Sequence, residues 1–444
     1  MILDDLAPEL LLLILCQIDT PKDLHSFISA SPHCYRLFEG SQEHVISCVL
    51  RNAFRIENIH HAVGALSLPA AHKRIRPSNA EITSALDRYF DGDALDLPED
   101  KASLVALCRL YHRVNQYTSD YFQHSLYILG YVPNCAADFY PSIRERTRFY
   151  RGFLRLELFC RAFYDRAYPD DPEPGNSKQI QFDDFISRLE PWEVEEISCA
   201  LCYLVFVVEG VVDAVEDHLY KALLTNPATH IMPPGEAPPR ELTNTDIPDG
   251  RYLVCCDGLD REGLELFSER GRYLAPERII SLAALGLGFV HHLVKSNNDK
   301  RYLIIQRKAK RGLFLPDTLD SAPSTDAEIR TPDKFNNIRV DRPNLGWFWF
   351  KAREQHIYSG WHPTYDNWRL RERAFVFWDP RRIRNLKGLY AQFPNARKGR
   401  VDGVYARWSR ESLEERLSDM WIPKIFMNEI LHGSGELPPD EEDY

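Results

Sequence analysis

The sequence predicts a mainly α-helical fold, in which an N-terminal module of three short helices precedes an irregular, mostly helical region with few or no strands. A leucine-rich run followed by two helix-start signals occupies the first 40 residues. Longer segments carry apolar residues every three or four positions, the helical period. No repeat of fixed period is visible, which argues against leucine-rich, WD and helical-repeat solenoids.

The first helix is expected from Pro8 to Ile18. Proline is tolerated in a first helical turn, and Glu9 suits the positive end of the helix dipole. Its apolar stripe comprises Leu10, Leu11, Ile14, Leu15 and Ile18, and Leu12 and Leu13 extend the apolar surface beyond it. A helix that is apolar on most sides is expected to be buried on most sides.

Two further short helices follow from their start signals. Thr20 can cap a helix that begins at Pro21, and Asp23 occupies the third position of that helix. Ser31 and Pro32 repeat the pattern. Three short helices give a core near the lower limit for independent stability, so the module is expected to need a neighbour or a partner.

The N-terminal residues resemble the F-box, as found in large fungal F-box-like proteins. The resemblance rests on Leu6, Pro8, Glu9, Leu10, Leu11, Ile14, Leu15, Asp23, Leu24, Ile28, Ala30, Ser31, Cys34, Tyr35 and Phe38. The family's usual Leu-Pro pair is Leu6-Ala7 here, and its usual tryptophan is Tyr35 or Phe38. The resemblance implies docking on a Skp-type linker and, through it, on a cullin. The implied linker-protein interface is Leu6, Pro8, Leu10, Leu11, Ile14, Leu15, Leu24 and Ile28.

A leucine-rich stretch such as this one has two other interpretations. A core helix of a larger helical domain would also be leucine-rich, but it does not explain the two capped starts that follow. A signal peptide is rejected because Asp4 and Asp5 stand where a basic region belongs and the apolar run is short.

The expected organisation is an F-box-like module at 1–55, a helical domain at 80–300, an aromatic- and Arg-rich region at 340–432 that packs on it, and an acidic tail at 433–444. The stripe Val45, Ile46, Val49, Leu50 and Phe54 extends the first unit. His60-His61 and Pro69 to Pro77 are interpreted as a polar connection. Irregular segments are expected at Pro169–Asn176, Asn226–Gly250 and Leu315–Asn344.

Within the helical domain the expected helices are marked by their apolar stripes. One stripe runs from Leu104 to Val114, and an aromatic-rich helical segment follows from Tyr121 to Leu129. A capping box at Ser142 and Glu145 opens a long helix. The most regular stripe is Ile197, Leu201, Leu204, Val208, Val211 and Val215. A further helix from Pro276 to Val290 contains two glycines, and Arg301 to Gln306 is expected to be a strand or a helix end.

Composition bounds the class of protein. At 444 residues the chain exceeds the usual size of a single core. No apolar run is long enough to cross a bilayer. Ten scattered cysteines without a secretory signal favour a soluble protein of the reducing cytoplasm or nucleus. The net charge of -11 is uneven, because Arg342–Arg410 contains fifteen Lys or Arg against five Asp or Glu, which leaves about -21 for the rest.

The sequence contains no constellation that organises catalysis. Cys199 and Cys202 form a Cys-x-x-Cys, but no second pair stands at zinc-site spacing, so both are interpreted as core cysteines. Cys255-Cys256 lacks further ligands, and the His60-His61 and His291-His292 pairs diverge on a helix. Nucleophile-elbow, dinucleotide and phosphate-loop motifs are absent. We therefore expect no enzyme activity, no cofactor and no metal site.

The strongest distal feature combines aromatic residues with arginines, and seven of the eight tryptophans lie between Trp347 and Trp421. The candidate target-recognition residues are Trp347, Trp349, Trp361, Tyr365, Trp368, Arg371, Trp378 and Arg381. Such a set recognises an acidic protein segment, stacks nucleic-acid bases, or forms an aromatic core with arginines at its rim. Nucleic acid is the least favoured ligand because no RNA-recognition or helix-turn-helix pattern is present.

Two functions follow from these features. The first is a non-catalytic substrate adaptor of a cullin-RING ubiquitin ligase, whose module docks on the linker and whose remainder presents an unknown protein substrate. The second is a binding protein that uses the basic aromatic region for an acidic partner or nucleic acid. An enzyme is a distant third, which a pocket around His362, Asp366 and Asp379 would revive.

Overall fold

The structure is a computed structural model that describes residues 6–69, 77–91, 96–129, 140–163, 178–225, 276–308 and 367–385, with positions 319 and 347. Helices form throughout these residues, and no strand occurs among them. The predicted mainly α-helical fold is confirmed. The expected loops at Pro169–Asn176 and Asn226–Gly250, most of Leu315–Asn344 and the acidic tail lie outside the described residues.

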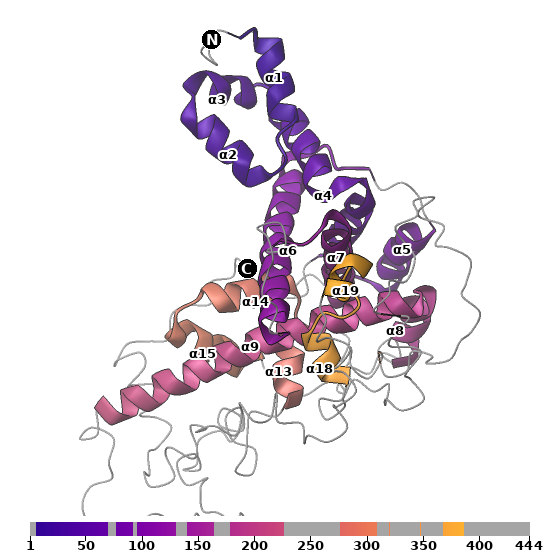
Figure 1. The fold of residues 1–444 in the computed structure, drawn as a ribbon, viewed down its shortest axis with the longest axis vertical. Coiled ribbons are helices and arrows are strands. Elements are labelled where there is room, and N and C mark those ends of the chain that lie inside the picture. Colours follow the sequence, from indigo (N-terminus) through magenta and orange to yellow (C-terminus); the bar gives the residue numbers. More distant parts are fainter. Residues whose placement is uncertain are drawn as a thin grey trace, which may run out of the picture.

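The N-terminal module consists of α1 (Pro8–Cys16), α2 (Pro21–Ala30) and α3 (Pro32–Glu39). Both predicted caps are present. The Thr20 hydroxyl accepts a hydrogen bond from the Asp23 backbone N–H at 3.1 Å, and the Ser31 hydroxyl accepts one from Cys34 N–H at 3.3 Å. The module projects from one end of the molecule (Figure 1).

Helix α4 (Gln42–Leu66) joins the module to the body, which is the rest of the described chain. The predicted stripe from Val45 to Phe54 is buried, and the Phe54 ring packs edge-on against Tyr111 of the body at 5.3 Å. Arg55 interrupts the helix with φ 58° and ψ 164°. The prediction of a polar connection at His60-His61 is wrong, because α4 continues to Leu66 and buries His61.

The body is built on long helices, which lie below the module in the view of Figure 1. Helix α6 (Lys101–Ile128) unites the two segments expected at Leu104–Val114 and Tyr121–Leu129. Helix α7 (Ile143–Phe163) starts at the predicted capping box, where Glu145 N–H donates to the Ser142 hydroxyl at 3.1 Å. It packs on α4, α6 and α9 (Pro191–Thr225), whose predicted stripe is buried along its whole length.

Three shorter elements lie between these long helices in the sequence: α5 (Asn79–Phe90), α8 (Lys178–Asp184) and a 3-10 turn (Ile186–Arg188). Helix α5 was not expected, although Ser78 and Glu81 form a capping box at its start.

The single helix expected from Pro276 to Val290 is instead two helices, α13 (Pro276–Ala283) and α14 (Leu287–Lys295). The break lies at Gly286, which has φ 90°, and a Cβ there would meet the Glu157 carboxylate at 2.7 Å. That carboxylate accepts a hydrogen bond from Leu287 N–H at 2.7 Å and so satisfies the start of α14. Residues Arg301–Gln306, expected as a strand or helix end, lie in α15 (Asn298–Lys308).

The last described segment carries α18 (Asn367–Glu372) and α19 (Pro380–Asn385), with buried Phe375–Trp378 between them. Its side chains join the same hydrophobic cluster as Leu15 of the module and Leu204 of α9. A single core therefore extends from the module to residue 383. None of the described helices combines the length and apolar character needed to cross a membrane.

Candidate functional site

The outer side of α1 is an exposed apolar stripe. Leu10 is 50% exposed, Leu13 is 61% exposed and Ile14 is 36% exposed. These positions are spaced i, i+3 and i+4, so they share one face of the helix. We call Leu10, Leu13 and Ile14 the docking face. The expectation that this helix is buried on most sides is therefore wrong, since only Leu11, Leu15 and Cys16 are buried in it.

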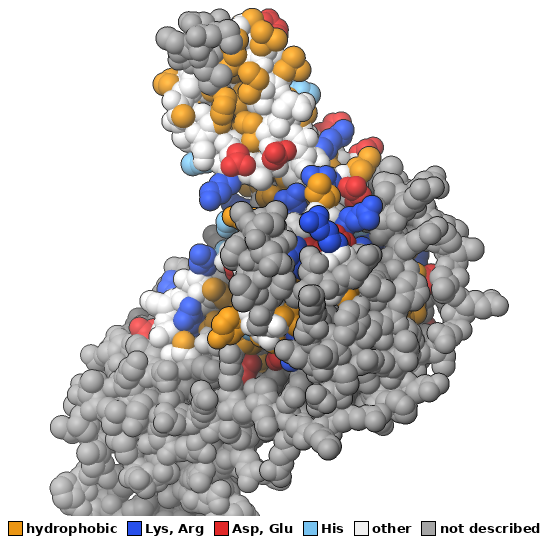
Figure 2. Space-filling model, viewed as in Figure 1, with side chains coloured by type: hydrophobic (Ala, Val, Ile, Leu, Met, Phe, Trp, Pro, Cys, Tyr) orange, Lys and Arg blue, Asp and Glu red, His pale blue; other side chains and the backbone are white. Residues whose placement is uncertain are grey.

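Hydrophobic side chains gather on the projecting module in the space-filling view (Figure 2). Helix α3 adds Tyr35, which is 49% exposed, and α1 packs against α3. Large exposed apolar side chains grouped on one small unit are the usual mark of an interaction site.

The residues predicted for the linker interface divide into two groups. Leu11, Leu15 and Leu24 are buried and form the core of the module, while Leu6 and Ile28 are partly buried. Pro8, Leu10 and Ile14 are exposed. Of the predicted set, Leu11, Leu15 and Leu24 are therefore unavailable to a partner without rearrangement of the module.

Two exposed residues, Leu13 and Tyr35, were missing from the predicted interface. Leu13 could have been found from its position three residues after Leu10, on the side of the helix opposite to Leu11 and Leu15. Tyr35 belonged to the resemblance, but nothing in its spacing indicated exposure.

The candidate target-recognition residues whose side chains the structure describes do not form a common surface. Trp347, Arg371 and Trp378 are buried, and Arg381 is exposed. Trp368 lies in α18, with its side chain outside the described set, and Trp349, Trp361 and Tyr365 lie outside the described residues altogether. For the three buried residues the structure supports the aromatic-core interpretation. Trp378 packs edge-on against Phe122 at 5.4 Å, and Phe377 stacks on Phe149 at 4.2 Å.

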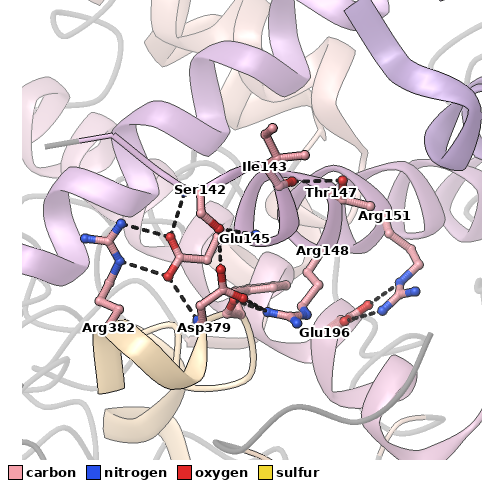
Figure 3. A network of polar contacts seen from close by, with 10 residues as sticks. Ser142, Ile143, Glu145, Thr147, Arg148, Arg151, Glu196, Asp379 and Arg382 are labelled. Carbon is pink, nitrogen blue, oxygen red and sulfur yellow. Dashed lines mark hydrogen bonds and ion pairs between the residues drawn. The ribbon is translucent and has the colours of Figure 1, made fainter. Parts of the chain in front are cut away.

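A buried polar network fastens this segment to the start of α7 (Figure 3). The Glu145 carboxylate accepts hydrogen bonds from Arg382 at 2.8 and 2.9 Å and from Asp379 N–H at 2.9 Å. Arg148 donates to the Phe377 carbonyl and to Asp379, both at 3.0 Å. Ser142 donates to Asp379 as well. Asp379, a candidate residue for an enzyme site, thus helps to hold this segment against α7.

Further buried ion pairs tie α9 to its neighbours. Arg371 pairs with Glu195 at 2.7 Å, and Arg151 pairs with Glu196 at 2.7 Å. Burial alone would lower the pKa of Arg371, but the Glu195 carboxylate raises it. Both described buried arginines of the basic stretch, Arg371 and Arg382, therefore face carboxylates of the body. The predicted binding of nucleic acid or an acidic partner by this stretch stays a prediction that no described contact favours.

The Cys-x-x-Cys pair lies in the core, as expected. Cys199 and Cys202 are fully buried on α9, and burial raises the pKa of both thiols well above the ordinary value. A thiol that stays protonated is a poor nucleophile. His362 and Asp366 lie outside the described residues.

Comparisons with protein-family models, with curated proteins and with solved structures find no match to this chain.

Proposed function

We propose that the chain is a non-catalytic adaptor that docks on a Skp-type linker, and through it on a cullin, by means of its N-terminal module. The body presents a protein substrate, and the assembly works in the cytoplasm or nucleus. The observation that carries the proposal is the docking face. Leu10, Leu13 and Ile14 remain exposed on a projecting three-helix module whose sequence resembles an F-box.

The geometry suits a partner with an apolar groove. One helix that presents residues at i, i+3 and i+4 is the arrangement by which a helix lies in a hydrophobic groove. The buried side of the same helix carries Leu11 and Leu15, so the module keeps its own core while the opposite side binds. Docking therefore requires no unfolding of the module.

The test is co-expression of the full chain with a Skp-type linker protein. The variant Leu10→Asp plus Leu13→Asp places two charges in the interface and is expected to reduce co-purification of the linker by about tenfold or more, or ~1.4 kcal/mol. Both side chains are exposed, so the helical circular dichroism of the variant is expected to match that of the parent. Leu11 is unsuited to this test because it is fully buried.

The matched control is Ile56→Asp, which changes an apolar side chain on α4 that is 74% exposed. This variant is expected to retain the linker, because Ile56 lies beyond the module. Undiminished co-purification of the docking-face variant would contradict the proposal.

A further inference from the structure

Three side chains with metal-binding atoms meet where α1 ends and α4 begins: Cys16, His44 and Cys48. One sulfur or ring-nitrogen atom from each lies within 4.8 Å of the others. His44 and Cys48 are spaced i, i+4 on α4, so both side chains project from one face of that helix. Cys16 is the last residue of α1, and it approaches them from the packed helix.

The separations are close to those of a tetrahedral site. Zinc bonds of about 2.3 Å to sulfur and about 2.0 Å to nitrogen put two sulfurs about 3.8 Å apart and a sulfur and a nitrogen about 3.5 Å apart. The Cys48 sulfur lies 3.9 Å from His44 Nε2. Closure around an ion therefore requires side-chain movements of about 1 Å or less, which rotation of the exposed His44 side chain provides.

The backbone around Cys16 is already fixed against α4. Asn52, one turn beyond Cys48, donates hydrogen bonds to the carbonyls of Cys16 at 2.9 Å and Ile18 at 3.0 Å. These bonds satisfy the end of α1 and hold it at a set position along α4. A ligand set held by packed helices needs little further ordering when an ion binds.

The ligand chemistry selects the class of ion. Two thiolates and an imidazole are soft or borderline donors, which suit zinc and disfavour magnesium and calcium. Cys16 is buried, Cys48 is partly buried and His44 is exposed, so an ion has a path from solvent on the His44 side. Three protein ligands leave a fourth position for water or for a donor from a partner.

We propose that Cys16, His44 and Cys48 bind one zinc-class divalent ion that joins the end of α1 to α4. Burial, together with the neighbouring Cys48, raises the pKa of the Cys16 thiol to about 11. A bound dication reverses this preference, because a coordinating thiol gives up its proton to become a thiolate. The ion then stabilises the helix that carries the docking face.

The test uses the full chain, reduced and stripped of metal with a chelator. Cobalt(II) is added as a spectroscopic probe, and zinc is then added to displace it. One equivalent of cobalt is expected to give thiolate-to-cobalt absorption that zinc abolishes, and zinc is expected to raise the melting temperature of the chain. This test does not involve the linker protein, so its result is independent of the proposed adaptor function.

Two variants and two controls identify the ligands. Cys48→Ser and His44→Ala are each expected to weaken cobalt binding by about tenfold or more. His44 is exposed, so its replacement leaves the fold intact and keeps the test valid if Cys48→Ser folds poorly. Cys108→Ser on α6 and the double variant Cys255→Ser plus Cys256→Ser are expected to retain the site.

Equal cobalt uptake by the parent chain and the two ligand variants would overturn the proposal. So would a Cys16–Cys48 disulfide found by mass spectrometry in protein purified without reductant, if the reduced chain takes up no cobalt. In that case the two sulfurs form a redox cross-link instead of a metal site.

Discussion

At the scale of single residues, His60 and His61 show how the body uses groups that the sequence placed in a polar connection. His61 is buried with Nδ1 2.8 Å from the Tyr89 hydroxyl, and His60 Nε2 donates to the Tyr89 carbonyl at 2.9 Å. Burial lowers the pKa of both rings, and the nearby Arg155 lowers it further. Both histidines are therefore neutral in the folded state near pH 7.

These histidines predict a loss of stability in mild acid. The unfolded chain binds protons below its ordinary histidine pKa of about 6.5, whereas the folded chain resists them. Stability therefore falls as the pH drops below about 6.5, since the unfolded state then binds more protons. His291, whose pKa burial lowers to about 4, extends the effect toward that pH. The urea midpoint is expected to be lower at pH 5 than at pH 7.

The control for this pH dependence is His60→Gln. Glutamine can still donate to the Tyr89 carbonyl but does not titrate, so the change in midpoint between pH 7 and pH 5 is expected to be smaller in this variant. An identical change in urea midpoint in the parent and the variant would show that His60 does not contribute to the pH dependence.

At this scale the sequence predicts the helix caps, but it does not predict which side chains are exposed. The caps at Thr20, Ser31 and Ser142 depend on residues three positions apart, so the sequence alone predicts them. Whether Leu13 faces solvent or Trp378 faces the core depends on which distant elements pack beside it. The proposed ligands Cys16 and Cys48 were missed for the same reason, although the i, i+4 spacing of His44 and Cys48 was visible.

At the scale of elements, α4 and α14 show that a stripe of apolar residues does not fix where a helix bends or ends. The stripe expected from Ile279 to Val290 crosses Gly286, where the chain takes a conformation that suits only glycine. In α4, buried residues lie on both sides of the break at Arg55, of which the sequence gives no sign. Apolar spacing records burial, and a helix break leaves that spacing intact.

The break in α4 predicts opposite effects of glycine at two nearby positions. Arg55 has φ 58° and ψ 164°, a region that costs a non-glycine residue on the order of 1–3 kcal/mol. Arg55→Gly relieves this strain and is expected to leave stability unchanged or to raise it by about 1 kcal/mol. Arg51→Gly, at an exposed position in the regular part of α4, is expected to lower stability by about 1 kcal/mol.

Urea unfolding at pH 7 measures both variants against the parent chain. Equal destabilisation by the two glycines would show that Arg55 is not strained.

At the scale of the whole molecule, the segment between α18 and α19 belongs to the core of the body, although it begins 148 residues after the end of α9 in the sequence. Trp378 is fully buried, and its ring N–H donates to the Arg373 carbonyl at 2.7 Å. The sequence identified the aromatic cluster but left open whether it formed a surface or a core. Contacts with α6 and α7 decide this, and they join parts of the chain that no local pattern relates.

The shared core predicts that one substitution near the end of the described chain destabilises the whole body. Trp378→Ala removes the largest fully buried side chain among the described residues and is expected to cost about 3–5 kcal/mol. The nearby exposed Arg381→Ala is expected to cost less than about 0.5 kcal/mol. Urea unfolding followed by far-ultraviolet circular dichroism reports on the helices of the chain, of which α4, α6, α7 and α9 are the longest described. An unshifted helical transition in Trp378→Ala would show that this segment folds apart from them.

Helix α4 also sets a direction. It begins beside the module and ends in the body, and its two helical parts meet at the non-helical residue Arg55, so the angle between the docking face and the body depends on the helical phase of both parts and on the bend at Arg55. Each residue of an α-helix advances the chain by about 100° around the axis and 1.5 Å along it. One residue inserted between Asn52 and Ala53, in the regular part of α4 before Arg55, would turn the body by about that angle relative to a partner held on α1. The number of residues in α4 before Arg55, together with the bend at Arg55, thus determines the side on which a docked partner meets the body.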